Sequence, residues 1–120
     1  MKIVKVTYDS PGTDRGGNTS LNAESVVIKN VSRTTQTLTG WTLRDTQNHV
    51  YKFPTFKLAA GKSVTVHTGK GTASQTHRYH NATWYVWNND RDQATLRNAT
   101  GATVHTCVWP PRGTGGFKNC

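Results

Sequence analysis

The first candidates for hydrolytic chemistry are Asp90 and Asp92, the two carboxylates closest to each other in the sequence. Hydrolysis commonly needs two convergent carboxylates, or a nucleophile with its base. Here both lie in the Asn-rich run 88–92, where Asx side chains usually hydrogen-bond to their own backbone. Asn88, Asp90 and Asp92 also offer alternating oxygen ligands for Ca²⁺, but no bidentate Glu follows, unlike in an EF-hand. We therefore interpret Asn88 and Asp92 as structural residues.

The five histidines do not form a pattern typical of a metal site. Two of them, His77 and His80, could approach one ion together, but they are three residues apart in a polar segment with no Cys or carboxylate nearby in sequence. Surface positions are the favoured interpretation for all five, which are His49, His67, His77, His80 and His105. The sequence thus predicts no bound metal.

Neither a phosphate-binding loop nor a nucleophile elbow is present. The stretch Gly69-Lys70-Gly71-Thr72 lacks the earlier Gly of a Walker motif, and Gly71 stands where Ser or Thr is required. No G-x-S-x-G sequence occurs. We therefore expect a non-catalytic protein without a cofactor.

The charge balance favours anionic partners. Fifteen Lys and Arg against six Asp and Glu give a formal net charge of +9. Such a field attracts nucleic acid, acidic polymers or anionic lipid. The basic residues are spread along the chain, so a generally basic, solvated surface is the alternative to a defined patch. Candidate contacts flank the middle loops: Lys52, Lys57, Lys62, Lys70, Arg78 and Arg91.

A β-prone run at residues 83–87 supplies aromatic candidates. Alternation places Trp84 and Val86 on one face and Tyr85 and Trp87 on the other. One pair should enter the core. The other pair, if exposed, can stack on bases or sugar rings, so Tyr85 and Trp87 are candidate binding residues. Core packing or coverage by the tail is the alternative.

The chain has two cysteines, Cys107 and the terminal Cys120. Two Cys alone cannot complete a four-ligand zinc site. A disulfide that closes the C-terminal tail is the natural interpretation, and it would add about 3 kcal/mol on the chain-entropy model. Unrelated thiols in a reducing cell are the alternative. Because a disulfide implies an oxidising compartment, we expect a secreted or cell-surface protein whose signal peptide has been removed.

Length and patterning predict one all-β domain. The 120 residues are the size of a single domain. Helical periodicity is weak, and about eight short alternating runs recur at spacings near a dozen residues, separated by turn residues. This pattern is typical of a two-sheet β sandwich. We expect the sandwich at residues 1–108 and a Gly-rich tail at 109–120, beyond the end of regular structure, held back by the disulfide.

The segment 36–45 breaks simple alternation. Leu38 and Trp41 are three residues apart, so strict alternation would place them on opposite faces. A β-bulge at Gly40 would let Leu38, Trp41 and Leu43 all point inward. The sequence therefore predicts a bulge at Gly40.

Five short motifs in a fixed order resemble one known family. The motifs are N-x-E-x-V-x-I-x-N at 22–30, G-W-x-L-x-D at 40–45, F-P at 53–54, L-x-x-G-x-x-V-x-V-x-T-G-x-G at 58–71 and W-N-N-x-x-D-x-A-x-L at 87–96. Together they resemble the lamin tail domain over about residues 3–106. The resemblance implies an immunoglobulin-like β sandwich.

The resemblance also implies a non-catalytic module. In animal lamins the domain binds partners, and DNA or chromatin binding has been attributed to it, whereas bacterial members occur in secreted or surface proteins as accessory modules. The terminal Cys pair resembles the secreted bacterial members. Glu24 and Asp45 match family positions and are expected to hold loops through backbone N–H groups. The positions expected to be structural are Glu24, Gly40, Trp41, Asp45, Asn88 and Asp92.

The sequence thus predicts an extracellular binding or accessory module that contacts a polyanion or a cell-surface partner through its basic surface. Two alternatives stay open at this point. One is a sequence-tolerant DNA-binding domain, whose affinity would fall steeply with salt. The other is a structural envelope module that associates with itself.

Overall fold

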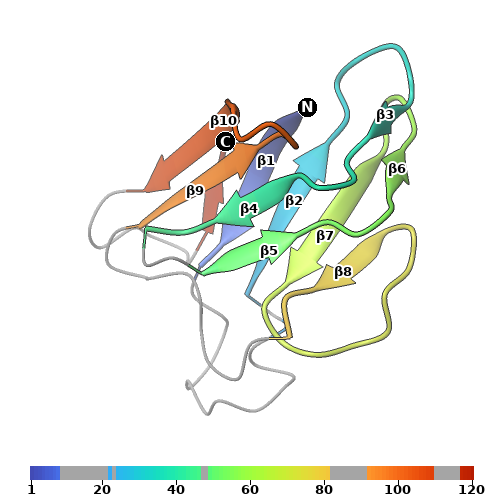
Figure 1. Cartoon of the computed structure of the whole chain (residues 1–120). Coiled ribbons are helices and arrows are strands. Elements are labelled where there is room, and N and C mark those ends of the chain that lie inside the picture. The colour runs from blue at the N-terminus through green and yellow to red at the C-terminus, as the bar shows by residue number, and fades with distance from the viewer. Residues whose placement is uncertain (9–21, 23, 47–48, 82–91, 110–116) are drawn as a thin grey trace.

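A computed structural model describes residues 1–8, 22, 24–46, 49–81, 92–109 and 117–120 (Figure 1). The described part is all-β. Its strands are β1 (Lys2–Thr7), β2 (Ser25–Lys29), β3 (Gln36–Thr37), β4 (Thr42–Arg44), β5 (Val50–Lys52), β6 (Lys57–Leu58), β7 (Ser63–His67), β8 (His77–Tyr79), β9 (Asp92–Arg97), β10 (Thr103–Trp109) and β11 (Phe117–Asn119).

Two sheets form the sandwich, as the sequence predicts. One sheet has the strand order β11-β1-β2-β7-β8 and the other has the order β10-β9-β4-β5, while β3 and β6 form a small separate pair. Every pairing is antiparallel except that of β7 with β8. In Figure 1 the sheet containing β4, β5 and β9 lies in front of the one containing β1, β2 and β7. The fold is an immunoglobulin-like β sandwich.

Alternating apolar residues of both sheets build one core between them. In the first sheet, Val26 pairs with Val66 across β2 and β7. In the second, Leu43 of β4 pairs with Leu96 of β9. All four side chains belong to the same buried cluster. The residues that alternate with them therefore lie on the two outer faces, which point away from each other.

Most of the alternating runs in the sequence form strands where the structure describes them. The clearest is the hairpin of β9 and β10, whose turn follows Asn98. The Asn98 side chain accepts hydrogen bonds from the backbone N–H groups of Thr100 and Ala102, and Gly101 adopts φ +88°. This is an Asx-type turn with a left-handed glycine. The predicted strand at 83–87 lies outside the described residues.

The bulge predicted at Gly40 is wrong. Gly40 instead lies in a tight turn, with φ +81° and a hydrogen bond of 2.9 Å from the Trp41 N–H to the Leu38 carbonyl. The turn separates β3 from β4 and still buries Leu38 and Leu43, with Trp41 partly buried against them. Register shifts occur in β1, between Ile3 and Lys5, and in β10.

Two strands lie where the sequence predicts none. The polar segment after β7 contains β8, which runs parallel to β7. Its apolar contact comes from Arg78, whose guanidinium lies 4.5 Å from the centroid of the Phe56 ring. The tail contains β11, which pairs with β1. Neither segment shows apolar alternation. Each pairs with the edge of a strand that is already in the sheet, so it does not need an apolar face of its own.

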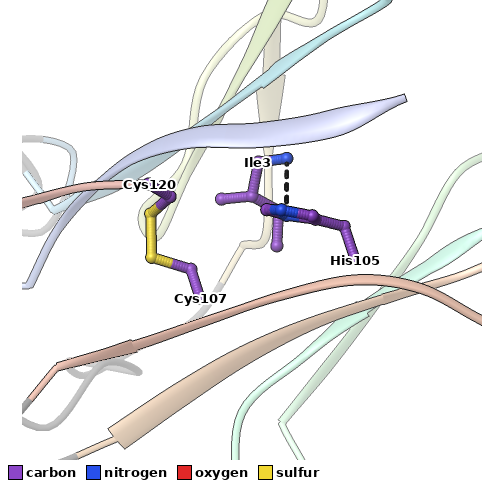
Figure 2. Close-up of a disulfide and its surroundings, with 4 residues drawn as sticks. All are labelled: Ile3, His105, Cys107 and Cys120. Carbon is purple, nitrogen blue, oxygen red and sulfur yellow. Dashed lines mark hydrogen bonds between the residues drawn. A yellow bond between two sulfur atoms is a disulfide. The ribbon is translucent and has the colours of Figure 1, made fainter.

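The predicted disulfide between Cys107 and Cys120 is confirmed and joins β10 to the end of the chain (Figure 2). Beside it, the His105 Nδ1 accepts a hydrogen bond of 3.2 Å from the Ile3 N–H. The Cys120 N–H donates to the Val4 carbonyl. These contacts connect the outer strand of one sheet to β1 of the other along one side of the sandwich.

Candidate anion-binding face

The outer face of the β10-β9-β4-β5 sheet gathers three cations. Thr42 of β4 lies in register between Lys52 of β5 and Arg97 of β9. In the next row, Arg44 of β4 lies between Val50 and Thr95. We call the surface formed by Thr42, Arg44, Lys52, Thr95 and Arg97 the basic face.

Alternation explains why these side chains point outward. On β4, the buried Leu43 separates the half-buried Thr42 and Arg44. On β9, the buried Leu96 separates the half-buried Thr95 and Arg97 in the same way. Because the two leucines fill the core, their neighbours must lie on the opposite side of the sheet.

The three cations form a compact triangle. Lys52 and Arg97 are two strand spacings apart, which is about 10 Å at their backbones. Arg44 lies two residues along β4 from the row that holds them, or about 7 Å. Threonine hydroxyls at positions 42 and 95 lie among them. The arrangement presents donors over an area that suits several neighbouring anionic groups.

The arginines of the basic face keep donors that the protein does not use. The Nε atoms of Arg44 and Arg97 are shielded from solvent and have no hydrogen-bond partner. Arg44 Nη2 makes a long contact of 3.4 Å with the Thr42 hydroxyl. An unsatisfied shielded donor costs free energy. An anion that draws the guanidinium outward would satisfy it.

Negative charge is scarce on the described surface. Both acidic side chains that the structure describes, Glu24 and Asp45, are buried. The Asp45 Oδ2 lies 2.6 Å from the His49 Nδ1, and the Asp45 side chain is turned away from solvent. Lys52 and the two arginines of the basic face therefore have neither of these two carboxylates beside them at the surface.

The structure does not gather the cations singled out from the sequence into one cluster. Lys52 belongs to the basic face. Lys57 lies on β6, Lys62 just before β7, and Lys70 just after it, while Arg78 points at Phe56. The remaining candidates lie outside the described residues: Tyr85, Trp87, Asn88 and Arg91.

Sequence reasoning missed Arg44 and Arg97. Each follows a core leucine within its own strand, and this alternation is visible in the sequence. What the sequence does not give is the register that places β4 between β5 and β9. The sequence therefore indicates that each arginine points outward, but it does not indicate that the two arginines and Lys52 lie together.

Comparison with known families decides the identity of the fold. The lamin tail domain model matches residues 1–111. The chain belongs to the lamin tail domain family. A comparison with curated proteins found no match. The lamin tail domain is an immunoglobulin-like family without enzymatic activity, and the predicted family and fold are both confirmed.

One pair in this lamin tail domain is similar to part of a catalytic triad. The Asp45 Oδ2 lies 2.6 Å from the His49 Nδ1, and its Oδ1 accepts the His49 N–H at 2.8 Å. In a triad, a carboxylate orients the histidine toward a nucleophile. In the described part of the chain, no Ser, Thr or Cys side chain hydrogen-bonds to the His49 ring. Asp45 thus closes a loop.

His80 lies close to this pair. Burial lowers the pKa of His80, the charge of His49 lowers it further, and the backbone hydrogen bond and Asp45 raise it. The His80 Nε2 is shielded and unpaired, and its ring centroid lies 6.1 Å from that of Tyr51. Its neutral form packs against the sheet, and no reacting partner is present among the described residues.

Two more of the positions predicted to be structural, Glu24 and Asp92, lie within the described residues. Glu24 is 1% exposed, and its Oε1 accepts a hydrogen bond of 2.7 Å from the Thr68 hydroxyl. Its carbonyl also accepts the Thr68 N–H at 3.1 Å. Asp92 begins β9, paired with Trp109. The described residues contain no cluster of three or more potential metal ligands.

Proposed function

We propose that this lamin tail domain is a non-catalytic binding module that holds a polyanion on its basic face. The observation that carries the proposal is the register that places Arg44, Lys52 and Arg97 together on one outward surface. The burial of Glu24 and Asp45 supports it, because those carboxylates do not compete at the surface.

The chemistry of the side chains favours phosphate, sulfate or carboxylate groups. Arginine presents a planar fork of donors that matches these anions in bidentate geometry, and lysine adds a point charge. Three cations at spacings of about 7 to 10 Å suit a chain of anions better than a single ion. Each contact would release counterions, so affinity would depend on salt.

We place this activity outside the cell. The disulfide between Cys107 and Cys120 supports an oxidising compartment, where such bridges form and persist. No helix in the described residues is long and apolar enough to cross a bilayer. Acidic polymers of a cell surface, or extracellular nucleic acid, are the polyanions such a module would meet.

Binding of a short DNA duplex and of heparin, each measured across about 50 to 200 mM salt, tests the proposal. We expect both to bind at low salt, with affinities that fall linearly on a log–log plot. Equal binding would indicate a general polyanion surface. Tighter binding of DNA with a steeper slope would favour the DNA-binding alternative. No binding of either at low salt would overturn the proposal.

A second candidate function is association with a protein partner or another copy of the chain. Val50, on edge strand β5, is 41% exposed, and Val104 and Val108, on edge strand β10, are 37% and 53% exposed. Three exposed valines on the two edge strands of one sheet are apolar contacts of the kind that interfaces use. Light scattering that reports a dimer insensitive to salt would favour this function.

A further inference from the structure

Two histidines meet on the outer face of the other sheet. His67 ends β7 and His77 begins β8, and the parallel register of the two strands places them diagonally. The His67 Nε2 lies 2.9 Å from the His77 Nδ1. His77 is exposed and His67 half-buried. The pair that sequence spacing suggested, His77 with His80, does not form, because His80 lies beside Tyr51.

The His67 tautomer is fixed by a backbone contact. The His67 Nδ1 lies 2.8 Å from the carbonyl oxygen of Asn22, which can only accept a hydrogen bond. The Nδ1 therefore carries a proton, and in the neutral ring the Nε2 carries a lone pair. Asn22 is itself held, because its side-chain amide donates to the Lys70 carbonyl at 2.9 Å. In metal-binding histidines, the ring nitrogen that does not bind the metal typically donates a hydrogen bond to a carbonyl or carboxylate in this way.

Packing fixes the orientation of the His67 ring. The Tyr79 ring stacks on it with centroids 5.1 Å apart and planes 20° apart. Tyr79 in turn lies so close to Gly71 that a Cβ atom at this glycine would collide with the ring. The lone pair of the His67 Nε2 thus points at a defined position, occupied in this structure by the N–H of His77.

We propose that His67 and His77 form a two-ligand site for a late divalent transition metal, with Cu²⁺ bound most tightly. Imidazole nitrogen suits Cu²⁺, Ni²⁺ and Zn²⁺, and affinity peaks at Cu²⁺ in this series. Two metal–nitrogen bonds of about 2.0–2.1 Å at a right angle separate their nitrogens by about 2.9 Å. The two nitrogens already lie 2.9 Å apart, as hydrogen-bonded neighbours, so only His77 must move for both to contact one metal ion.

Metal binding replaces the shared proton. His77 gives its Nδ1 proton to solvent and takes one at Nε2, so the ring stays neutral and its Nδ1 lone pair becomes a ligand. The His67 ring stays in place, and the His77 ring shifts and turns so that its Nδ1 lone pair points at the position faced by the His67 Nε2. Exposure of His77 gives it the freedom to turn. Water fills the remaining coordination positions, consistent with the absence of a third potential ligand among the described residues.

Calorimetric titration of the untagged protein with Cu²⁺, and separately with Mg²⁺, tests the site. We expect one Cu²⁺ per chain and no binding of Mg²⁺, which prefers oxygen ligands. His77→Gln should weaken Cu²⁺ binding by at least about tenfold, because loss of a supporting contact alone costs 10- to 100-fold. His67→Gln should do the same. Electron paramagnetic resonance should show two coupled imidazole nitrogens in wild type and one in His77→Gln.

His49→Gln is the matched control, since it removes a histidine just before β5, which belongs to the opposite sheet, and should leave Cu²⁺ affinity unchanged. A thermal melt of each variant separates loss of the site from loss of the fold, and the exposed position of His77 makes its variant decisive. Wild-type affinity in His77→Gln would overturn the proposal. So would the absence of saturable Cu²⁺ binding by the wild-type protein.

Discussion

At the scale of single residues, the buried carboxylate of Glu24 depends strongly on its hydrogen-bond partners. Burial of a charge is costly unless hydrogen bonds compensate it. The Thr68 hydroxyl supplies one such bond, at 2.7 Å in a fully buried setting. This contact joins the residue before β2 to the residue after β7, so it closes the end of that strand pair.

We expect Glu24→Ala to lower the free energy of unfolding by about 1–3 kcal/mol, because it leaves the Thr68 hydroxyl buried without its acceptor. Urea denaturation monitored by Trp fluorescence measures this. Thr68→Val, which removes the donor at nearly constant shape, should also destabilise the fold. Lys29→Ala, at an exposed position, should stay within about 0.5 kcal/mol of wild type. A loss no larger in Glu24→Ala than in this control would contradict the role given to Glu24.

At the scale of elements, the contact of β1 with β10 depends on a neutral histidine. Burial lowers the pKa of His105 from 6.5, and the positive charges of Lys2 and the N-terminus lower it further. The His105 Nδ1 can accept the Ile3 N–H only while it carries no proton. The folded state therefore takes up this proton less readily than the unfolded state.

The sign of the pH dependence follows from linkage. Because the folded pKa of His105 is depressed, its contribution is fully present above 6.5 and is lost as pH falls through the folded pKa. We expect the free energy of unfolding to fall between about pH 7 and pH 5. His105→Gln, which keeps an acceptor but does not titrate, should show a smaller fall.

His80 also lowers the free energy of unfolding as the pH falls, since its pKa is lowered too, mainly by burial. The His105→Gln variant should therefore retain part of the pH dependence, and addition of His80→Gln should reduce the remainder. Urea denaturation at several pH values measures all three proteins. An identical pH dependence in wild type and His105→Gln would contradict the proposed contact between β1 and β10.

The elements that the sequence predicts well are those with apolar alternation. Val26 and Ile28, and likewise Val64 and Val66, mark β2 and β7 because each pair fills the core from a single strand. In contrast, β8 carries Arg78 at its inward position. A strand that enters the sheet by pairing with an existing edge does not need an apolar face of its own.

The candidate site is less predictable than the fold. The sequence offers Lys52 as a basic residue that flanks a middle loop, whereas Arg44 and Arg97 join it only through the register of three strands. Register is a non-local property that local patterns do not specify. For the same reason, the contact of His67 with His77 is hidden by a separation of ten residues and by an unexpected parallel strand.

At the scale of the whole molecule, the formal net charge of +9 makes some affinity for polyanions unavoidable. A diffuse field and a defined binding face differ in one respect. If a diffuse field binds the polyanion, neutralising any three basic residues should lower the affinity equally. If a defined face binds it, only the loss of the charges on that face should lower the affinity strongly. The outer faces of the two sheets point in opposite directions. Exposed lysines away from the basic face can therefore be neutralised as a control of equal charge.

The most direct measurement compares heparin binding by two triple variants with equal charge. One is Arg44→Gln, Arg97→Gln and Lys52→Gln, which neutralises the basic face. The other is Lys29→Gln, Lys57→Gln and Lys62→Gln, which neutralises three exposed lysines outside it. We expect the first variant to lose most of the affinity and to show a shallower salt dependence, because each lost cation contact reduces the number of counterions released. We expect the second to stay near wild type, and equal losses in both would contradict a defined anion-binding face.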